Sequence, residues 1–368
     1  MTDKQQYLRD YAVREWVAGR TSRRTLLRQL LGAGISLPAI AAILAESGIA
    51  IGAADAARPL RIFNVPKFTG FVYFELAKAG GAKACKELGA QQIYVGTTTA
   101  DVEGQVQVLQ NILPQHPDGI VLASLDLNAP VPVLRRALSE GTVVVTFDAD
   151  VAPAGRTLFV NMAPFKVQAK AMLESALANA PEGGKSIWIA PTPTVANFIS
   201  QKKALDELIA SEPRYRSIRF IDTLYANDDP EKSYSVGSSA MQAHPDLKLF
   251  ITGSGISNPA INKAIQDTGR AGKVFSTGFA LPSTMKTFLE DGTCKQFALW
   301  SPFQYGYMAT YCAILLKSGK MKTAPGTRIS IPSIGERTIG EGAVTNLSEM
   351  VFFTKGHEDF DTAIPMRS

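Results

Sequence analysis

The residues that could do chemistry in this 368-residue chain gather where short apolar runs end. Lys67 follows the run at residues 60–65, and Asp148 and Asp150 follow the run at residues 143–147. Carboxylates and an ammonium group could act in acid–base catalysis or hydrogen-bond to hydroxyls of a ligand. Two carboxylates at one strand end bind hydroxyls or cap a crossing more often than they form a catalytic pair, so the pattern favours binding.

Aromatic and amide side chains accompany these charges at other strand ends. A polyhydroxylated ring needs such a set, because its C–H faces stack on aromatic rings and its hydroxyls pair with acids and amides. Phe68, Phe71 and Phe74 are spaced three apart, so they could instead form one core stripe of a helix. The candidate ligand-binding residues are Lys67, Phe68, Phe71, Asp126, Asp148, Asn197, Phe198, Ser254, Phe279, Trp300 and Gln304.

Sequence signatures of other chemistries are missing. Three His and three Cys occur without metal-ligand spacing, so we expect no metal and no cofactor. Residues 183–186 resemble the end of a phosphate-binding loop, but Asn179 replaces the first glycine and a strand is expected to follow. No nucleophile elbow and no dinucleotide fingerprint is present. We therefore expect a binding protein and not an enzyme, with an exported carboxylate-dependent enzyme acting on a carbohydrate as the alternative.

The elements that position these residues alternate between strand and helix, which predicts βαβ units. The expected strands are apolar throughout, as in a parallel sheet that is covered on both faces. A first series comprises strands 60–65, 92–95, 119–125 and 143–147 and helices 75–88, 101–113 and 131–139. A second series comprises strands 158–161, 186–189, 218–221, 247–252, 273–277 and 296–300 and helices 165–177, 195–209, 231–243, 259–267 and 283–289.

Two series of similar length predict an α/β fold of two doubly wound parallel-sheet lobes, with a ligand cleft between the carboxyl ends of their strands. A long helix is expected at residues 304–316, and short strands at 328–331 and 350–353. No tether-like linker occurs, so the lobes must be joined by short crossings, at residues 148–153 and 299–303. The expected domains are residues 57–150 with 301–320 for the first lobe, and 151–300 with 321–368 for the second.

The N-terminus has the pattern of an export signal. Arg23 and Arg24 precede an apolar, small-residue run at residues 30–45, as in twin-arginine signals. This run has 16 residues, fewer than the roughly 20 that span a bilayer, so a cleaved signal is favoured over a membrane anchor. Residues 54–56, Ala-Asp-Ala, offer a cleavage site. Residues 1–56 are therefore predicted to be a twin-arginine signal peptide, and the mature protein to be periplasmic.

The formal net charge of +5 is spread along the chain without a block of Lys or Arg. A nucleic-acid partner is therefore not expected.

Several stretches of the mature chain match one known family in their residues. With these stretches the chain resembles the class I periplasmic sugar-binding proteins of ABC transporters, most closely the rhamnose-binding and autoinducer-2-binding (LsrB-like) branch. The stretches are Val65-Pro66-Lys67, residues 102–107, Thr146-Phe147-Asp148-Ala149-Asp150, residues 193–195, Thr277-Gly278-Phe279, residues 296–300, Gln304-Tyr305-Gly306 and residues 315–323.

The resemblance implies a fold of the periplasmic binding protein type I. It also implies an exported, monomeric receptor that closes on a small carbohydrate and delivers it to a membrane permease. Lys67 and Asp148 match positions that contact ligand in the autoinducer-2 branch.

The chain departs from its relatives within the expected pocket. The autoinducer-2 branch has an Asp-Gln pair where this chain has Asn197 and Phe198. Pentose-binding relatives have an Asp and an Arg where this chain has Ala280 and Ala149. Fewer charges and one more aromatic ring favour a sugar, deoxysugar or polyol of the rhamnose kind. An autoinducer-2-type signal is the alternative ligand.

Overall fold

The computed structural model describes residues 10–12, 14–15, 23–33, 35, 58–347 and 350–356. The chain forms two compact units, residues 1–58 and 59–368. In the first unit, helix α2 (Arg23–Gly32) buries Leu26 and Leu30. The predicted cleavage site after Ala56 and most of the apolar run lie outside the described residues. No helix in the described part of the chain is long and apolar enough to cross a membrane.

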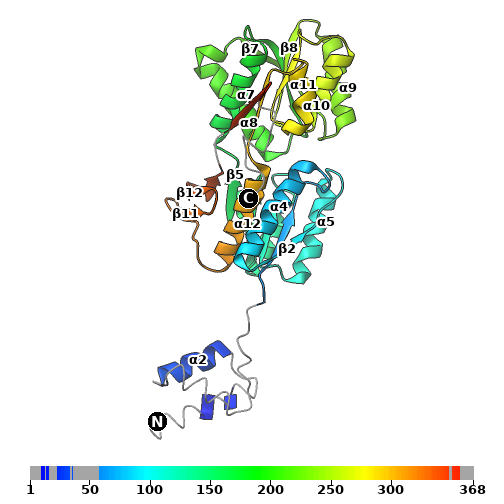
Figure 1. The fold of residues 1–368 in the computed structure, drawn as a ribbon. Coiled ribbons are helices and arrows are strands. Elements are labelled where there is room, and N and C mark those ends of the chain that lie inside the picture. The colour runs from blue at the N-terminus through cyan, green and yellow to red at the C-terminus, as the bar shows by residue number, and fades with distance from the viewer. Residues whose placement is uncertain are drawn as a thin grey trace. The chain divides into compact units, whose positions relative to one another are not determined.

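The second unit contains two α/β lobes, each built on its own parallel sheet (Figure 1). The strands of the first lobe are β1 (Arg61–Val65), β2 (Gln91–Tyr94), β3 (Gly119–Leu122), β4 (Val143–Phe147), β5 (Leu158–Asn161) and β13 (Val344–Asn346), and its helices are α4 (Val72–Leu88), α5 (Val102–Ile112), α6 (Val131–Ser139) and α12 (Pro302–Lys317). The sheet order is β13-β5-β4-β3-β1-β2. Its central strands are buried on both faces, which explains their unbroken apolar runs.

The second lobe has the sheet order β7-β6-β8-β9, again with parallel pairing. Its sheet strands are β6 (Gly184–Ala190), β7 (Ile218–Tyr225), β8 (Leu247–Thr252) and β9 (Phe275–Gly278), and its helices are α7 (Phe165–Asn179), α8 (Ala196–Ser211), α9 (Pro230–Ala243), α10 (Ser257–Asp267) and α11 (Pro282–Glu290). Strand β10 (Gln296–Leu299) joins β9 through a bridge between Ala298 and Phe279, and β14 (Val351–Thr354) pairs antiparallel with β10.

Smaller elements complete the described part of the fold. A hairpin is formed by β11 (Arg328–Ile331) and β12 (Gly335–Thr338). Short 3-10 helices lie at η1 (Leu113–Gln115), η2 (Pro153–Gly155) and η3 (Pro213–Tyr215).

The predicted two-lobe α/β fold is confirmed, but two strands belong to a different lobe than expected. Leu158–Asn161, expected to open the second lobe, pairs with β4 in the first sheet, and Val344–Asn346 pairs with β5 in the same sheet. After β4 the chain turns back through η2, and the Thr157 amide donates to the Val144 carbonyl at 2.8 Å. The predicted crossing at residues 148–153 is therefore wrong, because the chain leaves the first lobe only after β5.

Two crossings between the lobes lie wholly within the described residues: residues 162–164 between β5 and α7, and residues 300–301 between β10 and α12. The chain also passes from β13 in the first sheet to β14, which pairs with β10. Buried amides lie beside the first crossing. The Gln168 side chain donates to the Ala163 carbonyl at 2.6 Å, and Gln201 donates to Gln168 Oε1 at 2.9 Å. Helices α7 and α8 of the second lobe are thus tied to this crossing by hydrogen bonds.

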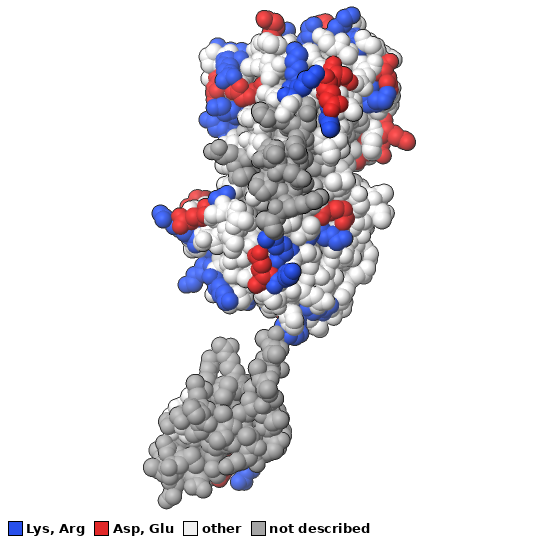
Figure 2. All heavy atoms as spheres, viewed as in Figure 1, with Lys and Arg blue, Asp and Glu red and all other residues white. Residues whose placement is uncertain are grey.

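The charges on the face shown in Figure 2 alternate in sign over the second unit. Among the described residues, ion pairs one helical turn apart include Lys202 with Asp206 and Lys263 with Asp267. Such exposed pairs stabilise a helix by about 0.2–0.5 kcal/mol each. This face therefore shows no extended patch of one charge.

Helices α4 and α12 of the first lobe pack at backbone contact distance. A Cβ atom added at Gly306 would lie 2.0 Å from the Ala77 carbonyl oxygen, and one added at Gly80 would lie 1.9 Å from the Phe303 carbonyl oxygen. Glycine is required at both positions because a methyl group would force the helices apart. This close approach fixes α12 relative to Tyr73 on α4, which the ligand site needs.

We predict that Gly306→Ala lowers the free energy of unfolding by about 1–3 kcal/mol, as overpacking usually does, although alanine favours helix more than glycine. Thermal unfolding of the mature chain measures the loss as a lower melting temperature. Gly340→Ala is the control, because its added Cβ would lie 3.5 Å from the nearest heavy atom, an ordinary contact. Equal melting temperatures for the two variants would contradict this account of the helix pair.

Candidate functional site

A cavity of about 50 Å³ lies between the two lobes. Its walls come from the carboxyl ends of strands in both sheets, as expected for this fold class. Nine of the eleven candidate residues line it: Lys67, Phe68, Phe71, Asp148, Asn197, Phe198, Ser254, Phe279 and Trp300.

The structure does not bring Asp126 and Gln304 into the lining of this cavity. The Asp126 carboxylate accepts hydrogen bonds from the backbone amides of Asn128 and Ala129, both at 2.8 Å, so it holds its own turn. Gln304 lies in the first turn of α12, where its backbone amide donates to the capping Ser301 hydroxyl. Both residues follow strands as predicted, but the hydrogen bonds recorded for them lie within their own turn or helix end.

The cavity also has lining residues outside the candidate list. Asp228 is the charged one, and it lies in the loop after β7. The sequence prediction ended this strand at Ile221, whereas β7 continues to Tyr225. The residues of β7 beyond Ile221 are half-buried or exposed, so the apolar run ends before the strand does. The other added residues are Tyr73, Phe74, Gly253, Gly255, Ile256, Ala280, Leu281 and Leu299.

A buried ion pair forms part of the first-lobe wall of the cavity. Lys67 Nζ is 2.8 Å from Asp148 Oδ2, and the two side chains are only 6% and 9% exposed. Lys67 follows β1 and Asp148 follows β4, so both charges are held at one edge of the first sheet. Buried charges require such pairing because transfer out of water is costly.

The backbone at Asp148 adopts a left-handed conformation, with φ of 63°. Aspartate tolerates this region better than most residues with a Cβ atom. The Asp148 amide donates to the Tyr305 hydroxyl at 2.6 Å, and that hydroxyl donates to the Val160 carbonyl at 2.8 Å. Tyr305 on α12 thus fixes the turn that directs the carboxylate into the cavity.

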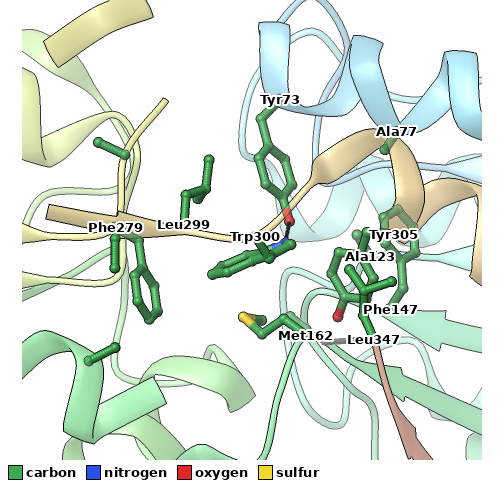
Figure 3. Close-up of a cluster of buried hydrophobic side chains, with 14 of the residues drawn as sticks. Tyr73, Ala77, Ala123, Phe147, Met162, Phe279, Leu299, Trp300, Tyr305 and Leu347 are labelled. Atoms are coloured by element: carbon green, nitrogen blue, oxygen red, sulfur yellow. Dashed lines mark hydrogen bonds between the residues drawn. The ribbon is translucent and has the colours of Figure 1, made fainter. Parts of the chain in front are cut away.

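A chain of hydrogen bonds links Asp148 to the crossing at Trp300. Trp300 Nε1 donates to the Tyr73 hydroxyl at 3.0 Å, and that hydroxyl donates to Asp148 Oδ1 at 3.1 Å. Figure 3 shows Trp300 between Phe279 of the second lobe and Tyr305 of the first. Burial, followed by the charge of Asp148, raises the pKa of Tyr73 well above its usual value. Tyr73 therefore stays protonated and can donate to Asp148.

Asp150 is bonded away from the cavity. Its carboxylate accepts from the Thr146 hydroxyl at 2.5 Å and from the Val151 amide at 2.9 Å, and it pairs with Arg156 at 2.7 Å. Arg156 in turn donates to the Gly342 carbonyl at 2.9 Å, just before β13. Asp150 therefore supports the β4–β5 connection and the neighbouring β13 segment.

The second-lobe wall offers an acceptor at Asn197. This side chain lines the cavity, its residue is 4% exposed, and its Oδ1 has no hydrogen-bond partner among the described residues. Buried polar atoms are nearly always bonded, so a ligand hydroxyl is a natural partner. The Ser254 hydroxyl differs, because it donates to Asp228 Oδ1 at 2.6 Å and accepts from the amides of Ile256 and Ser257.

The aromatic residues both line the cavity and pack on one another. Ring centroids lie 5.8 Å apart for Phe68 and Phe71 and 5.9 Å apart for Phe68 and Phe74. The core stripe and the ligand wall, which the sequence left as alternatives, thus occur together. Lys67 Nζ lies 5.7 Å from the ring centroid of Phe198, which brings a first-lobe cation onto a second-lobe ring.

The match to known proteins covers most of the chain. Residues 62–321 match the periplasmic binding protein domain family. The chain belongs to this family. Its members are periplasmic solute-binding proteins of transporters and not enzymes, which agrees with the binding protein expected from the sequence.

The relatives of this periplasmic binding protein include sugar-binding and sugar-transport proteins and an LsrB. A D-ribose/D-allose-binding protein from Pseudomonas aeruginosa is 27% identical over 290 residues, covering 75% of this chain and 88% of the relative. A sugar ABC transporter structure from Actinomyces odontolyticus is 33% identical with a TM-score of 0.67, over 82% of this chain and 96% of that one. LsrB from Clostridium saccharobutylicum in complex with AI-2 is 27% identical with a TM-score of 0.75, over 81% and 98%. The chain is therefore a substrate-binding protein of the sugar ABC transporter class.

We predict that Asp148→Asn weakens sugar binding about ten- to a hundredfold, because hydrogen bonds to charged groups contribute about 1.5–3 kcal/mol. Isothermal titration calorimetry with L-rhamnose, D-fucose, D-arabinose and D-ribose measures the change. Asp150→Asn is the control, since its carboxylate is bonded within the protein and should change affinity less. A more damaging Asp150→Asn, or an Asp148→Asn variant as tight as the parent, contradicts the placement of the site.

Proposed function

We propose that this periplasmic binding protein takes up a neutral sugar, deoxysugar or polyol of the rhamnose kind in the cavity between its lobes. The observation that supports this most is the convergence of both lobes on the Lys67–Asp148 pair within aromatic walls. The ammonium donates to a ligand oxygen, and the carboxylate accepts from ligand hydroxyls.

The balance of polar and apolar lining favours a deoxysugar or another sparsely hydroxylated ligand. Polar groups gather around Lys67, Asp148 and Asn197, whereas Ile256 and Leu281 add aliphatic surface beside the aromatic rings. Aromatic and aliphatic side chains stabilise the C–H faces and a methyl group of a sugar by removing them from water.

An autoinducer-2-type signal is the second candidate ligand. Support comes from the 27% identity with an LsrB that is in complex with AI-2, and from Lys67 and Asp148 in the cavity. Phe198 in the lining weighs against it, because this ring replaces an amide of that branch and makes the wall less polar.

We also propose the route and the partner. A twin-arginine signal at residues 1–56 directs export, and cleavage after Ala56 leaves a monomeric mature protein. The mature protein closes on its sugar and delivers it to the membrane permease of an ABC transporter.

We predict that a neutral sugar raises the melting temperature of the mature protein and reduces its radius of gyration. A ligand at 100 times its dissociation constant adds about 2.7 kcal/mol to stability, and a site shared by two lobes closes on binding. A thermal-shift screen over L-rhamnose, D-fucose, D-arabinose, D-ribose, common polyols and autoinducer-2 identifies the ligand, and small-angle scattering then measures compaction.

Two outcomes of this screen count against the proposal. Stabilisation by autoinducer-2 alone would assign the protein to the signal-receptor alternative. Scattering curves that are identical with and without a bound sugar would remove the closure step.

We predict that changing Arg23 and Arg24 together to Lys traps the precursor in the cytoplasm, because the twin-arginine pathway requires the arginine pair. Cell fractionation and immunoblotting measure the distribution. Arg28→Lys lies outside the pair and is the matched control, expected to be exported normally. Normal export of the double variant would show that another route is used.

A further inference from the structure

Asp228 lines the cavity from a turn after β7 that contains two residues with positive φ. Asn227 and Asp228 both adopt left-handed conformations, with φ of 55° and 49°. The next residue, Asp229, has a different task, because its carboxylate caps α9 by accepting from the Lys232 amide at 2.6 Å. The two adjacent aspartates thus have different roles: Asp229 caps a helix, and Asp228 lines the cavity.

The Asp228 carboxylate is held in place by one side chain of its own lobe. Ser254 donates to Oδ1 at 2.6 Å, and the described residues provide no other hydrogen-bond donor to Asp228. Ser254 is itself fixed, since its hydroxyl accepts from the Ile256 and Ser257 amides at 3.2 and 3.1 Å. No hydrogen-bond donor to Asp228 Oδ2 occurs within the described part of the chain, so this oxygen is available to a ligand hydroxyl.

Asp228 also faces the charges of the other lobe. Burial raises its pKa, the positive charge of Lys67 opposes that rise, and the negative charge of Asp148 adds to it. Among the described residues that line the cavity, Lys67, Asp148 and Asp228 are the charged ones. With both carboxylates ionised, one cation and two anions give the cavity a net charge of −1.

We propose that Asp228 is a second ligand-binding carboxylate, which accepts a hydroxyl of the bound sugar and excludes acidic sugars. The inference rests on the proposed function and assigns a specificity to the same site. A neutral sugar can donate hydroxyl protons to both carboxylates. An aldonate brings a negative charge into a cavity that already has an excess of negative charge, and repulsion is strong where water is excluded.

The position of Asp228 also links recognition to closure of the lobes. Asp148 lies on the first lobe and Asp228 on the second, so a sugar that donates to both can do so only when the lobes meet. Specificity for neutral sugars and lobe closure then depend on the same pair of carboxylates.

The experiment compares the parent protein with Asp228→Asn and Asp229→Asn. Each is titrated calorimetrically with L-rhamnose, D-fucose, D-arabinose and D-ribose, and with the aldonate of each sugar, in which C1 is a carboxylate. We expect the parent to bind a neutral sugar at least a hundredfold more tightly than its aldonate. Asp228→Asn should bind that neutral sugar about ten- to a hundredfold more weakly than the parent does. The ratio of the aldonate's dissociation constant to that of the neutral sugar should also be at least tenfold smaller for this variant than for the parent. Asp229→Asn should match the parent, because asparagine also caps a helix.

The outcomes separate this inference from the proposed function. A parent that binds none of the four sugars overturns both. A parent that binds a sugar while Asp228→Asn keeps the same affinity and the same preference overturns the role of Asp228 alone. The parent also tests the inference without any variant, because an aldonate that binds as tightly as its neutral sugar overturns the exclusion of acidic ligands.

Discussion

The arrangement of this protein depends on one buried ion pair, between Lys67 and Asp148. Two charges removed from water gain little net stability from each other, so a buried pair is weak evidence for a structural role. Neighbouring side chains nevertheless hold Asp148 of this pair in place. The Tyr305 hydroxyl accepts from the Asp148 backbone amide, and the Tyr73 hydroxyl donates to the Asp148 carboxylate. The close packing of α4 on α12 holds both tyrosines in register. The first lobe is thus built to present a charged pair at the edge of its sheet.

The second lobe completes the site with different chemistry. Phe198 lies against the Lys67 ammonium, Asn197 offers an acceptor without a partner, and Asp228 adds a carboxylate. Because polar and aromatic groups of the cavity come from both lobes, neither lobe alone can surround a sugar. The chain passes between the lobes through short segments after β5 and after β10, and the Gln168 and Gln201 amides tie the first of these crossings to the second lobe.

Much of this site follows from the sequence because buried parallel strands have unbroken apolar runs, and the residues after them lie at one sheet edge. Lys67 and Asp148 were found in this way. Asp228 was missed because β7 has polar, half-exposed residues beyond Ile221, so its apolar run ends before the strand does. The sequence predicts the bounds of the strand Leu158–Asn161 correctly but places the strand in the wrong lobe, since the connection through η2 that brings it beside β4 has no apolar pattern. Asp126 also follows a buried strand, but its carboxylate accepts hydrogen bonds from backbone amides of its own turn and does not line the cavity.

A crystal structure of the mature protein grown with the best-binding neutral sugar tests the central claim most directly. The account predicts sugar density between the lobes, with a ring oxygen or hydroxyl within hydrogen-bond distance of Lys67 Nζ and with hydroxyls within hydrogen-bond distance of the Asp148 and Asp228 carboxylates. It also predicts the ring or methyl group of the sugar against Phe198 or Phe279. Sugar density at another surface, or in the cavity without contact to Lys67 or Asp148, would contradict the account.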